Sequence, residues 1–433
     1  MNLEIYRGEN IFTVVNVEED SFLIRKLMGE EYVSLNFILT EDVCIEINDR
    51  INIFGKNYYL NIMPDVKKVS SNEYHFTCIF ESEIYDLSKV QYLFFGQADF
   101  YLMGNAETFV ELIITNMNRI SSGWSKGSVD STIYKNLYFS GENCLSVLQR
   151  LADEFKTEFF IENKCINLCK VSNTTGISLE YGMGEGLYSI TRKSVNSKNI
   201  VTRLYPYGGE KNIPANYRNY SKRLMIGNQG SNYIEQNVSN YGVIEHSEIW
   251  DDIYPHREGT VSWVNSTNYL VFRDSGIDFD VNEQLISGVK AKIHFNTGNL
   301  AGYEFEILSY NHSNKEFVLI KNTDEKAYEL PNSAIKPAVD DKYVLLDIIM
   351  PQSYITAAEN ELLTAAQNYI AINSSPRVAY SVDLDWLFVK DNGYDFDIGD
   401  MVHIKDGGLS IDRDIRVIGI KRNIVNQYKY ELE

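Results

Sequence analysis

The best local gathering of titratable side chains in this sequence lies around Trp250. His246 and His256 flank the run Trp250-Asp251-Asp252. A carboxylate close to a histidine can carry out general acid–base catalysis or bind a metal ion. The chain contains 60 Asp and Glu residues, so such proximity also arises by chance. An enzyme centred on His246, Asp251, Asp252 and His256 is therefore kept as an alternative function and is not the preferred one.

An acidic stretch further along the chain has the composition of a calcium site. Calcium prefers carboxylate and amide oxygens, and such residues alternate here with others. The stretch lacks the glycine and the twelve-residue frame of an EF-hand. We therefore predict a solvated acidic loop and no metal ligand. The residues concerned are Asp274, Asp278, Asp280, Asn282 and Glu283.

Other short motifs do not indicate catalysis. The sequence has no HExxH zinc motif and no Walker phosphate loop. The glycine-rich run 182–186 lacks the GxGxxG frame, and we expect it to be a turn. The run 123–128 resembles a phosphate loop only in composition, because the spacing of its glycines and lysine is wrong. Asp395, Asp397 and Asp400 precede a predicted strand, where we expect the polar edge of a hairpin.

The cysteines predict a protein that folds in a reducing compartment. Five cysteines are an odd number and a low density for a disulfide scaffold. Cys165 and Cys169 share one face of a strand-like run, but no second ligand pair follows at the spacing of a zinc site. We expect buried, reduced thiols in a cytoplasmic setting. The five are Cys44, Cys78, Cys144, Cys165 and Cys169.

The periodicity of apolar residues shows which elements must position these side chains. Residues 1–96 alternate between apolar and polar positions, which is typical of short antiparallel strands in a barrel or sandwich. Residues 97–175 then change period and predict two helices, over 105–119 and 142–156, followed by strands. Asn143 is the expected N-cap of the second helix. We predict a small α+β module in this region.

One long helix stands apart from the strands around it. From 176 to about 350 the chain is again strands and turns, and after Pro351 the pattern predicts a helix over 353–372. Ser353 is the expected N-cap. The apolar residues form a narrow stripe at the a/d spacing of a coiled coil, and packing against its own domain or between subunits both remain open. The stripe consists of Ile355, Ala358, Leu362, Ala365, Tyr369 and Ile372.

Two distant segments of the sequence resemble each other. Each has an acidic turn, a short strand, a glycine-bearing loop and a return strand, at 47–62 and at 398–420. Residues 340–345 repeat the first half of the pattern more faintly. Short β patterns coincide often, so this likeness by itself is weak evidence for two related β-domains.

Composition excludes several classes of function. The chain has 433 residues, which corresponds to roughly three domains. Lys and Arg number 40 against 60 Asp and Glu, for a net charge of −20. Such a chain is a poor candidate for binding nucleic acid or an anionic membrane, because both require basic contacts. The N-terminus lacks the features of a secretory signal, and no apolar stretch is long enough to span a bilayer.

Two runs in the middle of the chain resemble motifs of a known family. Residues 202–209 and 251–259 are similar to elements of phage and prophage tail proteins of the baseplate-hub family, which includes the N-terminal hub region of tail-associated lysins. The order and spacing of the motifs carry this resemblance over about 200–425. The signature positions, which are structural, are Arg203, Tyr205, Pro206, Tyr207, Gly208, Tyr254 and Pro255. Further likenesses lie at 298–305, at 350–355 with the helix that follows, and at 415–417.

The resemblance implies a fold and an assembly. Members of this family are similar to two tail-tube-type β-barrels with modules inserted between them, and they form homotrimers. The fold class is then mainly β with α+β insertions, two tail-tube-like β-barrel domains and one long helix. Barrel one would cover 1–96, the α+β module 97–175, barrel two 176–210 together with 351–433, and an inserted β-rich module 211–350.

The function that the resemblance implies is that of a baseplate hub at the tail tip. A trimeric ring would join the hexameric tail tube to a fibre or spike, after synthesis in the host bacterial cytoplasm. The expected partners are further copies of the chain, tail-tube or distal tail proteins, and a fibre or spike protein. DNA is expected as cargo and not as a ligand, since an acidic channel repels phosphate. We expect no enzyme activity, no cofactor and no membrane insertion.

Two features leave other functions open. Lysin-type relatives continue into a peptidase, lysozyme or fibre-like region, whereas this chain stops at Glu433 inside a predicted last strand. Either a downstream part is missing or the protein is a hub only. The 30 tyrosines, together with many asparagines, also suit a glycan-binding surface protein. This alternative stands beside that of a cell-wall hydrolase, of the kind that tail-associated lysins contain, centred on His246, Asp251, Asp252 and His256.

Overall fold

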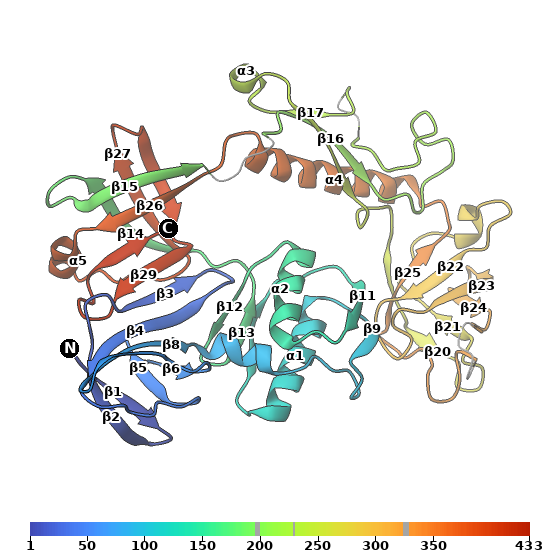
Figure 1. The fold of residues 1–433 in the computed structure, drawn as a ribbon. Helices are drawn as coiled ribbons and strands as arrows, with labels where there is room; N and C mark the ends of the chain where they lie inside the picture. The colour runs from blue at the N-terminus through green and yellow to red at the C-terminus, as the bar shows by residue number, and fades with distance from the viewer. Residues whose placement is uncertain (195–199, 228–229, 324–328) are drawn as a thin grey trace.

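The computed structural model describes residues 1–194, 200–227, 230–323 and 329–433. Strands make up most of the regular structure in these residues, so the prediction of a mainly β chain with α+β insertions and one long helix is confirmed. The parts follow one another around a loop (Figure 1). The largest sheet lies at the left, α1 and α2 below the centre, β20 to β25 at the right, and α4 crosses the top.

The largest sheet has 15 strands, and its first half comes from the N-terminus. The order there is β2-β1-β5-β6-β8-β4-β3, with β7 paired to β8. The half curls back on itself, because Val17 forms a bridge with Phe37. Alternate side chains such as Val33 and Leu35 then fill the interior. The strands are β1 (Asn2–Arg7), β2 (Asn10–Asn16), β3 (Phe22–Lys26), β4 (Glu31–Leu39), β5 (Arg50–Ile53), β6 (Lys56–Leu60), β7 (Asp65–Ser70) and β8 (Glu73–Glu81).

The second half of this sheet is joined to the first by strand pairing. β29 pairs antiparallel with β3, from Gly419 opposite Lys26 to Asn423 opposite Phe22. The order continues as β29-β30-β26-β15-β14-β27-β28, so β28 is the last strand. This half encloses its own apolar core. Its elements are β14 (Asn173–Tyr181), β15 (Gly186–Ser194), β26 (Val378–Leu384), α5 (Trp386–Asn392), β27 (Asp400–Asp406), β28 (Ile411–Arg416), β29 (Gly419–Asn423) and β30 (Tyr430–Leu432).

An α+β module follows the N-terminal half of the sheet. Its helices α1 (Ala106–Ile120) and α2 (Cys144–Phe155) agree with the predicted 105–119 and 142–156. The side chain of Asn143 accepts the N–H of Ser146, which confirms the predicted N-cap. Both helices contribute their apolar faces to one core. The other elements are the 3-10 helix η1 (Glu83–Lys89), β9 (Asp99–Gly104), β10 (Ser125–Val129), β11 (Lys135–Ser140), β12 (Phe159–Glu162) and β13 (Cys165–Leu168).

Two smaller sheets lie beyond the α+β module. β16 (Arg203–Gly208) pairs with β17 (Ile234–Glu235) and β18 (Glu245–Trp250), outside the large sheet. A seven-stranded sheet in the order β19-β25-β22-β23-β24-β21-β20 surrounds an aromatic core that includes Phe272 and Tyr343. The remaining elements are α3 (Val238–Tyr241), β19 (Glu258–Thr260), β20 (Trp263–Val264), β21 (Val271–Arg273), η2 (Val281–Gln284), β22 (Lys292–Phe295), β23 (Glu304–Asn311), β24 (Glu316–Leu319) and β25 (Lys342–Leu346).

The long helix α4 (Gln352–Asn373) agrees with the predicted 353–372. Its N-cap is Pro351, which makes no side-chain cap, so the prediction of Ser353 at this position is wrong. The helix packs on its own chain. Its N-terminal half lies against the core of the seven-stranded sheet and its C-terminal half against Val201 and Leu204.

The buried face of α4 departs from the predicted stripe. Ile355, Ala358 and Leu362 are buried as expected, but Ile372 is 58% exposed. The inner face moves to Ala366 and Ile370 instead. The reason is that an α-helix has 3.6 residues per turn, so a straight helix drifts out of a 3.5-residue repeat within a few turns. The side chains that face inward are Ile355, Ala358, Glu359, Leu362, Ala366 and Ile370.

The sequence echo corresponds to a turn that the structure repeats three times. In each copy a residue with positive φ precedes a buried aspartate, and the aspartate carboxylate accepts the N–H of the residue three positions earlier. We call these the entry turns, because each leads directly into a strand. Their residue pairs are Asn48-Asp49, Asp340-Asp341 and Gly399-Asp400. The hydrogen bonds are 2.8 Å from Glu46 N, 2.7 Å from Ala338 N and 2.7 Å from Asp397 N.

The backbone bonds around the three entry turns are also the same. The residue with positive φ donates its N–H to a carbonyl at the end of a neighbouring strand or directly after it, and that partner returns its N–H to the aspartate carbonyl. The faint third copy in the sequence is therefore as complete in structure as the other two. The partners are Leu60, the last residue of β6, and Val261 and Val417, which directly follow β19 and β28.

Candidate functional site

The two histidines of the alternative hydrolase centre face different neighbours. His246 lies in β18, where its Nε2 is 3.1 Å from Oε2 of Glu248 and its ring stacks on Tyr369 of α4. His256 lies in the segment after β18, and its Nδ1 is 2.7 Å from the carbonyl oxygen of Tyr254. The two rings therefore have no partner in common.

The two aspartates of that centre are engaged in separate ion pairs. Asp251 accepts from Nη1 of Arg223 at 2.5 Å. Asp252 lies 3.2 Å from Nζ of Lys135 in β11, a contact that joins this segment to the α+β module. The four residues thus have four different sets of partners and do not form a shared site. Within the described residues, no group of three or more His, Cys, Asp and Glu side chains could hold a metal ion.

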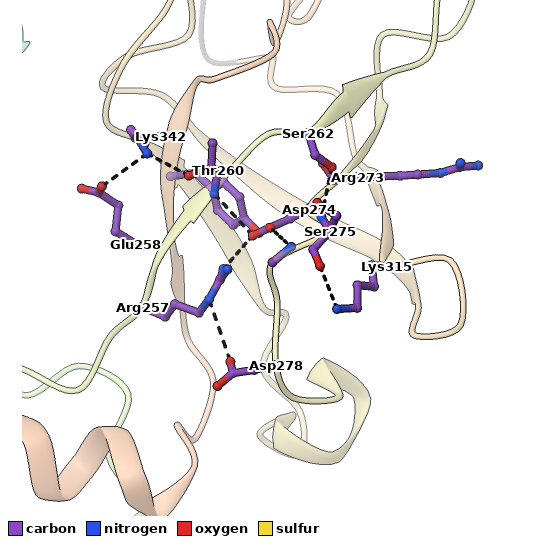
Figure 2. Close-up of polar contacts among 12 residues, drawn as sticks. Arg257, Glu258, Thr260, Ser262, Arg273, Asp274, Ser275, Asp278, Lys315 and Lys342 are labelled. Atoms are coloured by element: carbon purple, nitrogen blue, oxygen red, sulfur yellow. Dashed lines mark hydrogen bonds and ion pairs between the residues drawn. The ribbon is translucent and has the colours of Figure 1, made fainter.

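The predicted acidic loop contains a buried aspartate at its first position. Asp274 is 1% exposed, so the prediction of a solvated loop is wrong for this residue. Its Oδ2 accepts from Nη1 of Arg257 at 2.6 Å and from the Tyr343 hydroxyl at 2.8 Å, and its Oδ1 accepts the N–H of Gly276 at 2.8 Å (Figure 2). Both of its carboxylate oxygens accept hydrogen bonds from protein donors, and the carboxylate forms the centre of a polar network.

The ionisation of this network follows from its contacts. Burial alone would raise the pKa of Asp274, but the hydrogen bonds from Arg257 and Tyr343 outweigh it, and the pKa is lowered. Burial, and then the charge of Asp274, raise the pKa of Tyr343 well above its ordinary value. The carboxylate is therefore ionised and the phenol neutral, which is the arrangement that lets the hydroxyl donate.

The outer residues of the acidic loop connect the network to α4. The Tyr354 hydroxyl in the first turn of α4 donates to Oδ1 of Asp278 at 2.8 Å. Burial, followed by this hydrogen bond, raises the pKa of Tyr354 to about 12. Asp280 accepts the N–H of Asn282 at 2.9 Å and so begins the short helix η2. The stretch is a joint between the seven-stranded sheet and the long helix.

Arg203, the first signature residue, fastens three strands together. Its Nε donates to Glu235 of β17 at 2.7 Å and its Nη1 to Glu245 of β18 at 3.0 Å. The guanidinium also lies 4.4 Å from the centroid of the Tyr233 ring. The Tyr205 hydroxyl donates to the same oxygen of Glu245 at 3.1 Å.

The structure brings the two signature runs side by side. A Cβ on Gly208 would lie 2.6 Å from the carbonyl oxygen of Ile253, so only glycine fits there. Gly209 donates its N–H to the same carbonyl at 2.8 Å. The neighbouring signature residues are also buried or partly buried: Pro206 and Pro255 are buried, Tyr207 is half-buried, and burial raises the pKa of Tyr254 to about 12.

Asn212 is a structural residue that the sequence pattern did not reveal. Its side chain is buried, and its Nδ2 donates to the carbonyl oxygens of Pro255 at 3.0 Å and Leu345 at 2.8 Å. Its Oδ1 accepts the N–H of Ile348 at 3.4 Å. The backbone of Asn212 is left-handed, with φ of 61°. The only signal in the sequence is that asparagine tolerates this conformation, which does not single out one asparagine among many.

Glu359 is a second buried residue that the stripe on α4 missed. It is 6% exposed. Its Oε1 accepts from the Tyr217 hydroxyl at 2.7 Å and lies 3.0 Å from Nη2 of Arg218. A glutamate on the apolar face of a helix can be predicted to be buried only if the cation that pairs with it is known. For Glu359 that cation is Arg218, which lies far away in the sequence.

The glycine-rich runs and the hairpin aspartates lie in turns and strands and form no catalytic arrangement in the described residues. Residues 182–186 form the predicted turn between β14 and β15. Residues 123–127 also have the G-x-S-x-G spacing of a hydrolase nucleophile. That motif requires a turn from strand into helix, whereas Ser125 opens strand β10. Of the hairpin aspartates, Asp397 pairs with Arg25 of β3 at 2.7 Å, so it links the two halves of the large sheet.

The cysteines only partly follow the prediction of buried thiols. All five are free, Cys78 and Cys144 are buried, and Cys44 is exposed. Burial raises the pKa of both buried thiols to about 12. Among the described residues, no helix is long and apolar enough to cross a membrane.

The comparisons with known proteins identify the fold. No family model and no curated protein matches this chain. The prophage tail protein gp18 from Listeria monocytogenes EGD-e matches with a TM-score of 0.50 at 12% identity, over 100% of this chain and 93% of that one. The 43 kDa tail protein of prophage MuSo2 from Shewanella oneidensis matches with a TM-score of 0.51 at 9% identity, over 100% of this chain and 96% of that one. These matches show a shared fold, so the predicted resemblance to phage tail proteins is confirmed at the level of the fold.

Proposed function

We propose that this chain is a structural subunit of a phage or prophage tail, of the baseplate-hub type, and that three copies form a ring at the tail tip. The tail-protein fold is the premise. The observation that carries the proposal is the single sheet that runs through two barrel-like halves of one chain and joins them by the pairing of β3 with β29. Two such halves per chain and three chains would present six, which matches a hexameric tube.

The division into domains belongs to this proposal. Barrel one would be 1–96, the α+β module 97–175 and the inserted module 211–350. Barrel two would take 176–210 with 351–433, although β16 pairs with β17 and β18 instead of with the large sheet. The signature residues would then hold the inserted module against α4.

The partners follow from the proposed position in the tail. The ring would contact tail-tube or distal tail proteins on one side and a fibre or spike protein on the other. DNA would pass as cargo, and the net charge of −20 supports this, since a basic lining would hold phosphate. The protein would be made in the host bacterial cytoplasm and function in the virion tail.

The oligomeric state tests the proposal directly. We expect a mass of three chains in solution at micromolar concentration, and particle images of a ring with three-fold symmetry and a central hole. A protein that remains monomeric when mixed with its tail-tube and fibre or spike partners, and that is absent from purified tails, would contradict a hub.

The proposal includes the absence of catalysis, which needs its own measurement. Incubation with purified cell wall should release no fragments above the level of a His256→Ala variant. Reproducible release by the parent protein that the variant loses would replace the structural reading with a hydrolase.

A further inference from the structure

A histidine near the end of the large sheet has a carboxylate at each ring nitrogen. His403 lies in β27, and its Nδ1 is 2.8 Å from Oδ1 of Asp414. Its Nε2 is 2.9 Å from Oδ1 of Asp412. Both aspartates belong to β28, where Asp414 is the direct cross-strand partner of His403. The three side chains, which we call the Asp–His–Asp clip, fasten the last strand of the sheet to its neighbour.

The geometry of the clip selects one charge state of the ring. An imidazolium donates from both nitrogens, whereas a neutral imidazole has one donor and one acceptor. In the neutral ring, one nitrogen lone pair would therefore face a carboxylate oxygen at hydrogen-bond distance, which is repulsive. The clip is complete only when His403 carries its second proton.

The other charged groups near the clip are paired elsewhere. On the far side of β27, the residue opposite His403 is the uncharged Ser178 of β14. Lys405 of β27 lies 3.2 Å from Glu180 of β14. On β28, Arg413 contacts Tyr380 and Arg416 pairs with Glu158 at 2.6 Å. The two aspartates are thus the groups that decide the protonation of His403, and their hydrogen bonds raise its pKa.

Because β28 is the last strand of the sheet, the clip can control how easily this strand opens. β28 pairs with β27 on one side and ends the sheet on the other. A terminal strand opens more easily than a central one, because only one ladder of backbone bonds holds it. We propose that the Asp–His–Asp clip is a pH-dependent lock on β28, closed while His403 is an imidazolium and released when the ring loses its proton.

The sign of the effect follows from linkage. The proton binds more tightly in the closed hairpin than in the open one, so the lock is fully present below the ordinary pKa of about 6.5 and is lost as pH rises through the raised value. Each unit by which the pKa is raised should multiply the opening equilibrium of β28 by about ten between the acidic and alkaline limits.

The test combines two measurements on the full chain. Exchange at the histidine ring carbon, followed by mass spectrometry, gives the pKa of His403, which we expect above 6.5. Amide exchange, corrected for its intrinsic pH dependence, should show protection of β28 falling between pH 6 and pH 9. In His403→Gln this fall should vanish, and in His403→Lys, which keeps a positive charge, protection should persist at pH 9.

Two controls make the outcome specific. His75→Gln removes a histidine that has one carboxylate neighbour, Glu73 at 2.7 Å, and should leave the exchange of β28 unchanged. Protection of β4 in the first half of the sheet reports whether each variant is folded. The proposal is overturned if His403 titrates at or below its ordinary pKa, or if β28 keeps the same pH course in His403→Gln.

Discussion

Single buried polar residues hold distant segments of this chain together, and Asn212 shows how. Its one side chain bonds three backbone groups in two segments, one 43 positions and the other 133 to 136 positions further along the chain. Asp274 likewise joins its own loop to Arg257, just before β19, and to Tyr343 of β25. Such residues carry large penalties when removed, because each leaves buried partners without a hydrogen bond.

Truncation of Asn212 should destabilise the protein strongly. Asn212→Ala leaves the carbonyls of Pro255 and Leu345 unpaired and forces alanine into a left-handed backbone, so we expect a loss of about 2–4 kcal/mol in the free energy of unfolding. The measurement is denaturant unfolding followed by tryptophan fluorescence. Asn219→Ala is the matched control, since Asn219 is exposed and also left-handed, with φ of 58°. Equal losses in both variants would mean that backbone strain, and not the hydrogen bonds, sets the effect.

The buried Asp274 should make the stability of the seven-stranded sheet depend on pH in the acid range. Because its folded pKa is lowered, its stabilising effect is present above the unfolded value of about 3.9 and is lost as pH falls through the folded value. Asp274→Asn should cost about 3–5 kcal/mol at pH 7 by removing the nearer of the two carboxylates beside Arg257, and should flatten the stability curve below pH 4. Glu283→Gln, an exposed change on η2, is the control. Unchanged acid unfolding in Asp274→Asn would show that other carboxylates dominate.

At the scale of elements, the sequence predicts features that depend on neighbouring residues better than features that depend on contacts with distant segments. The helices α1, α2 and α4 were found within two residues of their ends, because their signals are local. The inner face of α4 was only half predicted, because Glu359 is buried by Arg218 and Tyr217 from another segment. For Asp274, the sequence suggests only a calcium ligand or a solvated carboxylate, because its actual partner also comes from another segment. A linear sequence does not show that Arg257 arrives beside it.

The entry turns give an element-scale prediction. A Cβ on Gly399 would lie 2.6 Å from Cγ2 of Val171, and its φ is 92°. Gly399→Ala should therefore cost about 2–4 kcal/mol, through a clash and a strained backbone. Combining it with Val171→Ala should recover the part due to the clash. Gly8→Ala is the control for strain alone, since φ there is 61° and nothing lies within 4 Å.

The docking of α4 should depend on its one buried carboxylate. Glu359→Ala removes the acceptor of Tyr217 and Arg218, so we expect a loss of about 2–4 kcal/mol and faster amide exchange over the N-terminal half of α4. Glu361→Ala, on the exposed side of the same helix, should change neither quantity by more than about 0.5 kcal/mol. Equal effects of the two changes would argue against a docking role for Glu359.

At the scale of the whole molecule, a few ion pairs close the loop of parts seen in Figure 1. Arg416 of β28 holds Glu158 of the α+β module through two bonds, at 2.6 Å and 2.8 Å. Lys135 of that module reaches Asp252, which follows β18. The sequence supplied the resemblance and the mainly β class, but no residue pattern could reveal which parts touch.

The Arg416–Glu158 pair should couple the C-terminal half of the sheet to the α+β module. A double-mutant cycle with Arg416→Ala and Glu158→Ala should give a coupling of about 0.5–2 kcal/mol in unfolding experiments, because the pair is bidentate and its side chains are only 28% and 13% exposed. The Lys405–Glu180 pair, with side chains 52% and 46% exposed, is the control and should give close to zero. A coupling no larger than the control would mean that other contacts set the arrangement.

The strands of the second half of the large sheet come from two distant parts of the sequence, which affects how the protein folds during its synthesis. β15 pairs with β26, and roughly 180 residues must be synthesised between them. At the usual bacterial rate of roughly 5–20 residues per second, β14 and β15 leave the ribosome about ten to forty seconds before their partner exists. During that interval their edges are open to wrong pairing. β30 lies between β29 and β26 in the sheet, so nascent chains that terminate before residues 430–432 would be expected to aggregate or recruit chaperones.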